Sequence, residues 1–314
     1  MTLMSKALSI AAVTVAYEGE RLLGRHLNAL LGQTRPLDEI VIVNNGSRDQ
    51  ALQFLQSNFP MVTVIDLVTN TGIAGGLSAG LSYAALQKRY DWIWTLDQDS
   101  VPEADSLERL LEGLTVLGAS GHRIGLLAPL CVCSEVGVSY PGLLWRNGWR
   151  LPPPEAKDLP TSFVDATISS GSLICREAVE RAGLPRVDFF MDFVDLEYCL
   201  RLRRLGYEIA VVRSSVLDHA LGKPRKLRIL GHSAVWTDHA PWRYYYMARN
   251  EVYTIWNYYP NWGPKYSVVR RLFHCASRLL LYGKNKTACL KMMFLGVVDG
   301  RKGRLGVRFF EGAK

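Results

Sequence analysis

The chain has 314 residues, 48% of them hydrophobic, which suits about two domains or one large α/β domain. Its six cysteines lack paired C-x-x-C spacing, which argues against a zinc site and favours reduced thiols in a cytoplasmic chain. No run of about 18 uninterrupted apolar residues exists, so no transmembrane helix is predicted.

The formal net charge of +8 is distributed unevenly. Residues 1–263 carry 25 Lys+Arg against 27 Asp+Glu, whereas residues 264–314 carry 12 against 2. In this last segment basic residues alternate with apolar ones, a pattern that suits an anionic membrane surface. The alternative is a solvated basic face on helices that dock on the rest of the chain. No nucleic-acid partner is expected.

Strands and helices alternate in the first part of the chain. Residues 8–16 are predicted as a buried strand rather than a signal-peptide core, because they are β-rich and end in a Tyr-Glu-Gly turn. Further strands are predicted over 39–43, 61–67, 91–96 and 124–130, with helices over 20–32, 49–57, 74–88 and 103–117. This order predicts an α/β fold with a doubly wound, mostly parallel sheet.

The second part is less regular. Prolines and tryptophans in residues 134–162 predict a long irregular excursion. No sheet is expected after residue 216, which divides the chain into residues 1–215 and a C-terminal helical region, 216–314. The elements expected beyond the excursion are helices over 176–182 and 192–205, a strand over 207–213, and helices over 241–257, 266–282 and 286–298.

Two carboxylates end the apolar strand in "DWIWTLDQDS" (91–100). Ligands of open α/β sheets bind beyond the carboxyl ends of the strands, where Asp97 and Asp99 are expected. Carboxylate pairs hold hard divalent ions such as Mg²⁺ or Mn²⁺ and leave room for phosphate oxygens. The alternative is that Asp99 caps the helix beginning near Pro102.

The Gly-rich turn "NTGIAGGLSAG" (70–80) opens a helix. Gly75, Gly76 and the amino end of this helix are expected to approach a phosphate or a sugar closely. A Rossmann dinucleotide loop fits less well, because the spacing is not G-x-G-x-x-G and the turn follows the third strand.

The acidic stretch "MDFVDLEYCLRLRR" (191–204) is predicted to be helical. Helical spacing puts Asp192 and Asp195 on one face, whereas Glu197 is turned by roughly 200° from Asp195. One of these carboxylates can serve as a general base. Alternatively, the acids pair with arginines on a solvated helix.

Two further side chains are candidates for binding a phosphate group or a metal. His219 can be an imidazole ligand of the metal or a donor to a phosphate group, or a histidine bonded within a loop. Arg249 can clamp a phosphate group bidentately or stack on Tyr245 or Tyr246.

Nine stretches, in this order, resemble the family 2 glycosyltransferases of GT-A fold. They are "AYE", "IVNNGS", "NTGIAGGLSAG", "WIWTLDQDS", "SSGSLI", "FMDFVDLEYCLR", "GY", "HALG" and "YYYMARN", between residues 10 and 257. The pattern is most similar to the bacterial rhamnosyltransferase branch. It departs from that branch around the nucleotide, at Ala16, Glu18, Asn44 and Ser78.

The resemblance implies an inverting transfer of L-rhamnose from dTDP-L-rhamnose to a saccharide or lipid-linked acceptor, in surface polysaccharide assembly of the O-antigen or capsule type. The family's base aligns on Asp195. Ala16, Tyr17 and Glu18 align beside the nucleotide, and the Asn45 amide is expected to face the edge of its base. Such an enzyme is expected on the inner face of the plasma membrane. The alternatives are a UDP-hexose or UDP-galactofuranose donor, or a non-catalytic scaffold that binds sugar nucleotides.

Overall fold

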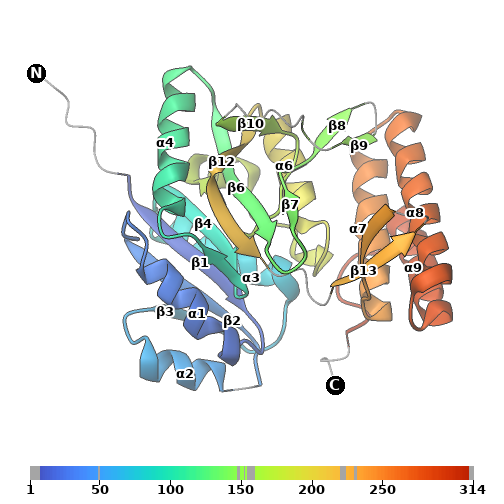
Figure 1. Ribbon diagram of the computed structural model, residues 1–314, viewed down its shortest axis with the longest axis horizontal. Helices are drawn as coiled ribbons and strands as arrows, with labels where there is room; N and C mark the ends of the chain where they lie inside the picture. Colours follow the sequence, from blue (N-terminus) through green and yellow to red (C-terminus); the bar gives the residue numbers. More distant parts are fainter. Residues whose placement is uncertain are drawn as a thin grey trace, which may run out of the picture.

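The computed structural model describes residues 8–48, 50–146, 149–151, 153, 160–219, 224–229 and 232–310. Strands and helices alternate through its first half, as the sequence predicts (Figure 1). Four of these strands pair in parallel, in the order β4-β1-β2-β3. The elements are β1 (Ile10–Ala16), α1 (Glu20–Leu31), β2 (Glu39–Asn45), α2 (Ala51–Asn58), β3 (Thr63–Leu67), α3 (Gly72–Leu81), the π-helical turn η1 (Ser82–Gln87), β4 (Trp92–Asp97), β5 (Ser100–Pro102) and α4 (Ser106–Ala119).

The second half extends the same sheet with strands of both directions. The full order is β10-β12-β6-β11-β4-β1-β2-β3, with β5 on β12 and β7 on β6. The elements are β6 (Ile124–Cys133), β7 (Val138–Tyr140), β8 (Leu144–Arg146), β9 (Trp149–Leu151), β10 (Thr161–Val164), β11 (Ser172–Cys175), α5 (Arg176–Ala182), the 3₁₀ turn η2 (Val187–Phe189), α6 (Val194–Arg204), β12 (Glu208–His219), β13 (Pro224–Ile229), β14 (His232–Thr237), α7 (Pro241–Tyr258), α8 (Trp262–Tyr282) and α9 (Lys286–Lys302).

The first four strands of the sheet are parallel, as expected, and the rest of the sheet is mixed. β12 pairs parallel with β6, whereas β5, β7, β10 and β11 pair antiparallel with their neighbours. β11 runs antiparallel to both of its neighbours, β4 and β6. No crossover helix lies between β6 and β11 in the part of this connection that the structure describes. Parallel neighbours need such a crossover, so a chain that returns without one pairs antiparallel.

Two further expectations need correction. β12 continues past residue 216 to His219, and β13 and β14 then form an antiparallel pair, so the prediction of no sheet after residue 216 is wrong. The sequence does not mark these strands, because half of "PRKLRI" is basic and "HSAVWT" has an apolar run of only three residues. The predicted excursion carries β7 to β10, and its residues 147–148, 152 and 154–159 lie outside the described part.

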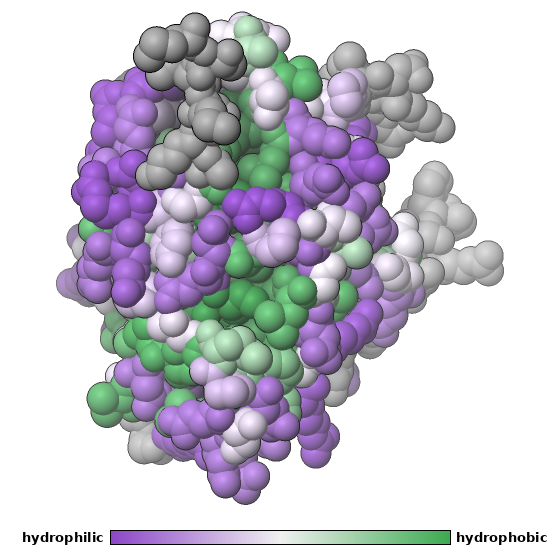
Figure 2. Space-filling model, turned by 90° about the vertical axis from the view of Figure 1, so that its left-hand side faces the viewer, coloured by the Kyte–Doolittle hydropathy of each residue, from purple (hydrophilic) through white to green (hydrophobic). Residues whose placement is uncertain are grey.

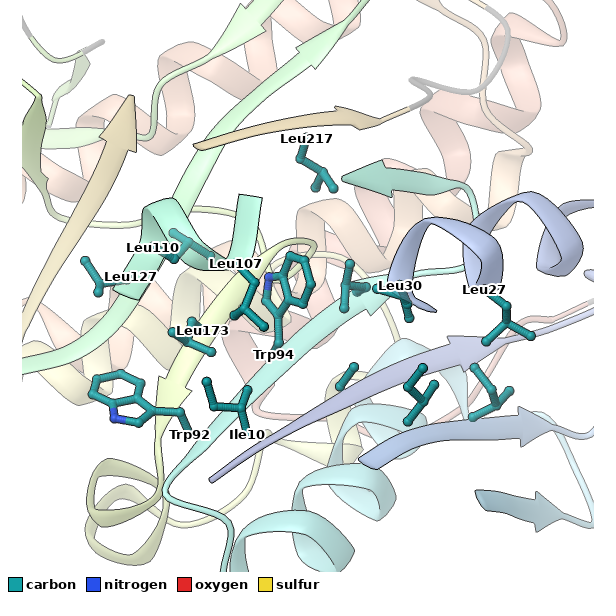
Figure 3. Close-up of a cluster of buried hydrophobic side chains, with 14 of the residues drawn as sticks. Ile10, Leu27, Leu30, Trp92, Trp94, Leu107, Leu110, Leu127, Leu173 and Leu217 are labelled. Atoms are coloured by element: carbon teal, nitrogen blue, oxygen red, sulfur yellow. The ribbon is translucent and has the colours of Figure 1, made fainter. Parts of the chain in front are cut away.

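Helices cover both faces of the sheet. Along β1, Ile10 and Ala12 pack with α1, α2 and α4, whereas Ala11 and Val13 pack with α3, α5 and α6. Successive side chains of a strand point to opposite faces, so one buried strand serves both cores. On the first face, the buried Trp94 ring lies among leucines of α1 and α4, and its indole N–H donates to Gly171 O at 2.8 Å (Figure 3).

Hydrophilic side chains dominate the face that carries α1, α2 and α4, with apolar areas between them (Figure 2). The C-terminal helices lie on the opposite side of the molecule (Figure 1). Among the described helices, none is long and apolar enough to cross a membrane.

Two glycines let α9 pack directly on the backbone of α7. A Cβ atom at Gly296 would lie 2.3 Å from Tyr245 O, and one at Gly300 would lie 2.5 Å from Arg249 O. These distances leave no room for a side chain, so the four-residue spacing of the glycines fixes how closely the two helices approach.

Gly296→Ala is therefore expected to destabilise the protein by about 1–3 kcal/mol, because the added methyl group meets main-chain atoms that cannot rotate away. The free energy of unfolding from urea titration measures this change. Gly118→Ala on α4 is the matched control, since its Cβ meets nothing within 4 Å. That change should stabilise by about 0.4–1 kcal/mol. Equal effects of the two changes would contradict the close α7–α9 packing.

Candidate active site

The two carboxylates of "DQDS" lie at the carboxyl end of β4, as the sequence predicts. Asp97 is the last residue of β4, and Asp99 lies in the turn to β5. Between them, Gln98 bonds the end of β1, since its amide accepts from Tyr17 N (2.9 Å) and donates to Tyr17 O (3.0 Å). These two hydrogen bonds tie the Gln98 side chain to the main chain at the end of β1, and so they fix the turn that carries Asp97 and Asp99.

His219 completes a cluster with the two carboxylates. One ligand atom from each of Asp97, Asp99 and His219 lies within 4.8 Å of the others. His219 Nδ1 lies 2.9 Å from Ser100 Oγ, and Nε2 lies 3.9 Å from an Asp97 oxygen. Two carboxylates and one imidazole at this separation fit a divalent cation. The geometry therefore brings together the three predicted metal ligands.

The serines of "SSGSLI" hold this cluster in place. Ser170 Oγ accepts from Asp97 N (3.1 Å) and lies 2.6 Å from Ser100 Oγ, which in turn contacts His219. Behind them, Ser100 O contacts Nδ1 of the buried His26 at 2.7 Å. Burial lowers the pKa of His26 to about 4, so this second imidazole is neutral at pH 7.

The segment before α6 has an unusual backbone. Phe190, Asp192 and Phe193 all have φ between 56° and 65°, the left-handed region that non-glycine residues rarely adopt. The helix begins only at Val194, so the prediction that Asp192 lies on the helix is wrong. Asp195 lies in its first turn, and both carboxylates still line the same cavity.

Arg249 and Asn250 of α7 hold this turn. Arg249 donates to Asp188 O and Phe189 O, both at 3.0 Å, and to Gly306 O. Asn250 donates to three carbonyls of the turn, those of Phe189, Met191 and Asp192, at 2.7–3.0 Å. Arg249 is fully buried and does not line the cavity, and its guanidinium lies over the rings of Tyr245 and Tyr246, which is the stacking alternative of the two that the sequence left open.

A different arginine, which the sequence analysis missed, occupies the cavity. Arg243 of α7 binds Asp192 through Nε and Nη2, at 3.0–3.2 Å. This pairing raises the pKa of the Arg243 guanidinium. Arg243 has no local signal in the sequence, because it lies in an aromatic helix among other candidate cations.

The Gly-rich turn also differs from expectation. Gly75 and Gly76 do not line the cavity; a Cβ at Gly76 would lie 2.4 Å from the Val15 side chain, so this glycine lets α3 pack on β1. Gly72 does line the cavity, with φ 72° and room for no Cβ beside Phe190 O. Gly72 is the first glycine of the Gly-rich stretch, and this position is the signal by which the sequence could have identified it as a cavity residue.

The residues expected near the nucleotide divide into two groups. Tyr17 and Asn45 line the cavity, whereas Ala16 and Glu18 do not. The Asn45 amide is bonded within the fold: its oxygen accepts from Thr71 N and Oγ1, both at 2.9 Å, and its nitrogen donates to Gly72 O at 3.0 Å. Both ends of the amide thus bond the 70–72 turn, which contributes Asn70 and Gly72 to the cavity lining, and the predicted contact of Asn45 with a base stays a prediction.

The remaining acidic residue has a structural role. Glu197 is buried, and its carboxylate accepts from Arg201 at 2.9 Å and from the Tyr258 hydroxyl. The prediction that Glu197 faces away from Asp195 and pairs with an arginine is confirmed.

Two adjoining cavities meet at this site. The first, of about 560 Å³, is bounded by the ends of β1, β2 and β4, the Gly-rich turn and the 190–195 segment. The second, of about 480 Å³, lies between the β6–β7 hairpin and helices α7 and α8. Five residues line both: Ile168, Asp192, Asp195, His219 and Arg243.

Two carboxylates of the site have shifted pKa values. Burial raises the pKa of Asp97 to about 6, opposed by His219 and reinforced by Asp99, although 32% of its side chain stays open to the cleft. Burial also raises the pKa of Asp195 to about 6; its bond from Leu196 N opposes this, and Asp192 and Asp97 add to it. A carboxylate with such a pKa accepts protons readily near neutral pH.

The family model described as "Glycosyl transferase family 2" matches residues 11–121. The dTDP-rhamnosyl transferase RfbF of Shigella flexneri is 27% identical over 300 residues, which cover 95% of this chain and 97% of that protein. The galactofuranosyltransferase GlfT1 of Mycolicibacterium smegmatis is 27% identical over 234 residues, covering 71% of this chain and 74% of that protein.

A solved structure has the same fold. The crystal structure of GalNAc-T7 with UDP, GalNAc and Mn²⁺ superposes with a TM-score of 0.62 at 17% identity, covering 95% of this chain and 56% of that one. This chain therefore spans just over half the length of that protein. With the match to family 2 over residues 11–121, the relatives along most of the chain and the acidic cluster at the strand ends, the chain is a glycosyltransferase of GT-A fold that is similar to family 2.

Proposed function

We propose that the enzyme transfers L-rhamnose from dTDP-L-rhamnose, with inversion, to a saccharide or lipid-linked saccharide in the assembly of a cell-surface polysaccharide. The observation that carries the proposal is the position of Asp195 at the junction of two cavities, one of which contains the acidic cluster. The choice of sugar is supported by the similarity to the rhamnosyl transferase RfbF along nearly the whole chain.

Asp195 is the proposed general base. The acceptor hydroxyl gives its proton to the Asp195 carboxylate as its oxygen bonds to the anomeric carbon. The bond from that carbon to the diphosphate oxygen breaks, and the electron pair leaves with the diphosphate. The raised pKa suits this task, because the carboxylate is ionised at pH 7 and still basic enough to accept the proton.

The leaving diphosphate needs positive charge nearby. A divalent cation held by Asp97, Asp99 and His219 supplies Lewis-acid stabilisation of this leaving group when it is bound. Arg243 supplies a second positive charge from the opposite wall, where Asp192 orients its guanidinium. An imidazole among the ligands favours Mn²⁺ over Mg²⁺, which prefers oxygen ligands alone.

The second candidate donor is UDP-galactofuranose. It is supported by the similarity to the galactofuranosyltransferase GlfT1 over 71% of this chain. Both donors carry a pyrimidine nucleoside diphosphate, so the cavity must discriminate chiefly through the sugar.

We also propose that the enzyme binds the inner face of the plasma membrane through α8. One face of this helix packs inward, whereas the outward stripe is apolar and follows the helical period. Trp262 and Phe273 in this stripe are 77% and 72% exposed. The stripe consists of Trp262, Tyr266, Val269, Phe273 and Leu280.

The positive charge of the C-terminal segment indicates what kind of surface this stripe binds. Residues 264–314 carry 12 Lys+Arg against 2 Asp+Glu, so a second copy of the same face would repel it. Anionic lipid attracts it by about 1 kcal/mol per basic residue near the surface, while the apolar stripe enters the headgroup boundary.

The first prediction concerns the base. Asp195→Asn keeps the size of the side chain but cannot take the proton, so transfer should fall by about 10²–10⁴-fold with donor affinity nearly unchanged. In the wild type, kcat/KM should fall as pH drops through about 6, because protonation removes the base. Steady-state kinetics from pH 5 to 8 measure both.

Glu197→Gln is the matched control. It should lose less activity and more stability, since Glu197 joins Arg201 and Tyr258. A dead Glu197→Gln enzyme beside a nearly normal Asp195→Asn enzyme would show that the base is assigned to the wrong residue.

The second prediction concerns donor and metal. Purified enzyme should release dTDP from dTDP-L-rhamnose faster than it releases UDP from UDP-galactofuranose or UDP-hexoses, and faster with Mn²⁺ than with Mg²⁺. Asp99→Ala should abolish the metal-dependent turnover and leave the thermal unfolding profile close to that of the wild type. Preferential release of UDP would reject rhamnose, and full activity in excess chelator would reject the metal site.

The third prediction concerns the membrane. The protein should float with vesicles that contain phosphatidylglycerol, but not with phosphatidylcholine vesicles, and high salt should weaken this binding. Phe273→Ala should lower the partition by about tenfold or more, because a buried Phe side chain contributes about 1.5–3 kcal/mol. Met61→Ala removes an equally exposed apolar residue elsewhere and should change nothing. Flotation independent of lipid charge would contradict the proposal.

A further inference from the structure

The last described segment, residues 303–310, leaves the C-terminal helices and returns to the first cavity. α9 is followed by Gly303, with φ 65°, and the chain turns again at Gly306, with φ 91°. Gly306 N then donates to Asp188 O at 2.7 Å, in the turn before α6. This segment lies beyond the nine stretches that resemble family 2, so its role has to follow from its own contacts.

Hydrogen bonds and an ion pair fix the end of this segment against α7 and α9. Arg308 N and Phe309 N donate to the hydroxyl oxygen of Tyr246, at 3.0 and 3.3 Å. The Arg308 guanidinium pairs with Asp299 of α9, which is buried. Tyr246 is fully buried on α7, so the main chain at residues 308 and 309 is attached to the core of the C-terminal helices.

The two phenylalanines that follow Arg308 take different positions. The Phe309 ring packs edge to face with Tyr245, with ring centroids 4.9 Å apart, and lines neither of the two cavities. The Phe310 ring lines the first cavity. Of these two neighbouring residues of the same type, therefore, only Phe310 is placed to meet a ligand of that cavity.

Phe310 completes a wall of four aromatic rings. Its ring centroid lies 5.3 Å from that of Phe190, 5.4 Å from that of Trp242 and 6.2 Å from that of Tyr17. All four rings line the first cavity and none lines the second, whereas Asp195 lines both. The aromatic wall therefore lies on the side of the first cavity away from its junction with the second.

The chemistry of this wall indicates which part of the donor it binds. A diphosphate needs cationic partners and sugar hydroxyls need polar ones, but the wall has no charge and only two polar side-chain groups, the Tyr17 hydroxyl and the Trp242 indole N–H. A pyrimidine base has a flat π face, and aromatic side chains are common stacking partners of bases. Tyr17 is also the member of the wall that the resemblance places beside the nucleotide. The wall thus suits the nucleoside end of the donor.

We infer that Phe310 is a donor-binding residue whose ring contacts the base of the sugar nucleotide beside Tyr17. This inference deepens the proposed sugar transfer and rests on it. The C-terminal segment is then part of the donor site. Nucleotide affinity accordingly depends on the contacts of Arg308 with Tyr246 and Asp299, because these hold Phe310 at the cavity.

The test removes one ring at a time. Phe310→Ala should weaken the binding of dTDP, or of UDP where the wild type binds UDP more tightly, by about tenfold or more, a loss of about 1.4 kcal/mol. The KM for the corresponding sugar nucleotide should rise by the same factor. Phe309→Ala is the matched control: it removes the neighbouring ring, which lies outside the cavity, and should leave nucleotide affinity close to that of the wild type. Isothermal titration calorimetry with Mn²⁺ present measures the affinities.

Two further variants separate the ring from its bulk. Phe310→Leu keeps an apolar side chain that can pack on Trp242 and Phe190 but has no π face. It should lose most of the same affinity, and it remains a test even where Phe310→Ala fails to fold. Phe310→Tyr keeps the ring and should bind the nucleotide nearly as well as the wild type.

The outcomes are distinct. Unchanged nucleotide affinity in Phe310→Ala or Phe310→Leu, an equal loss in Phe309→Ala, or a raised donor KM without any loss of dTDP or UDP affinity would overturn the inference, while nucleotide release by the wild type leaves the proposed function standing. A wild type that binds neither dTDP nor UDP and releases neither from a sugar nucleotide would overturn the proposed function, and this inference with it.

Discussion

The geometry of the site depends on a set of buried hydrogen bonds from two adjacent side chains of α7. Arg249 and Asn250 donate to carbonyls of the 188–192 turn, which contains left-handed non-glycine residues. A buried carbonyl without a partner costs about 1–3 kcal/mol, and a strained residue costs a similar amount. The turn that carries Asp192 and leads into Asp195 is therefore stable only while α7 supplies these donors. α7 in turn is set by the close contact of Gly296 and Gly300 with its backbone.

A second constraint is the concentration of negative charge. Asp97, Asp99, Asp192 and Asp195 all line the first cavity, and burial, reinforced by the neighbouring carboxylates, raises the pKa of Asp97 and of Asp195. Arg243 neutralises one of them directly, and the His219 cluster offers a place for a cation beside two others. Within the described part of the chain Asp195 makes no ion pair with a basic side chain, and burial raises its pKa and keeps its carboxylate basic. The charge pattern thus gives the carboxylates different roles: Asp97 and Asp99 can hold a cation, whereas Asp195 is suited to accept a proton.

The fold was predictable where the apolar pattern of each segment and the strand–helix–strand order of the chain indicate the same arrangement. Among the first four strands, β1, β2 and β4 are buried on both faces and are mostly apolar, and the helices between the four strands require parallel pairing. The antiparallel insertion of β11 was not predictable, because it depends on where a long, proline-rich connection returns to the sheet. The β13–β14 pair was missed because basic residues interrupt β13 and the apolar run of β14 is short. The start of α6 was misplaced because left-handed residues carry no signal in side-chain type.

By itself, the sequence determined that Asp97 and Asp99 end a buried strand and that Asp195 belongs to an acidic helix. These assignments follow from local periodicity and from the rule that strand ends meet at one edge of a sheet. Only the tertiary structure decided between Arg243 and Arg249. They are six residues apart on α7 and differ by about 240° around its axis, so only one can face the cavity. Which one does so depends on where α7 packs, and there Arg249 is buried against main-chain carbonyls while Arg243 meets Asp192.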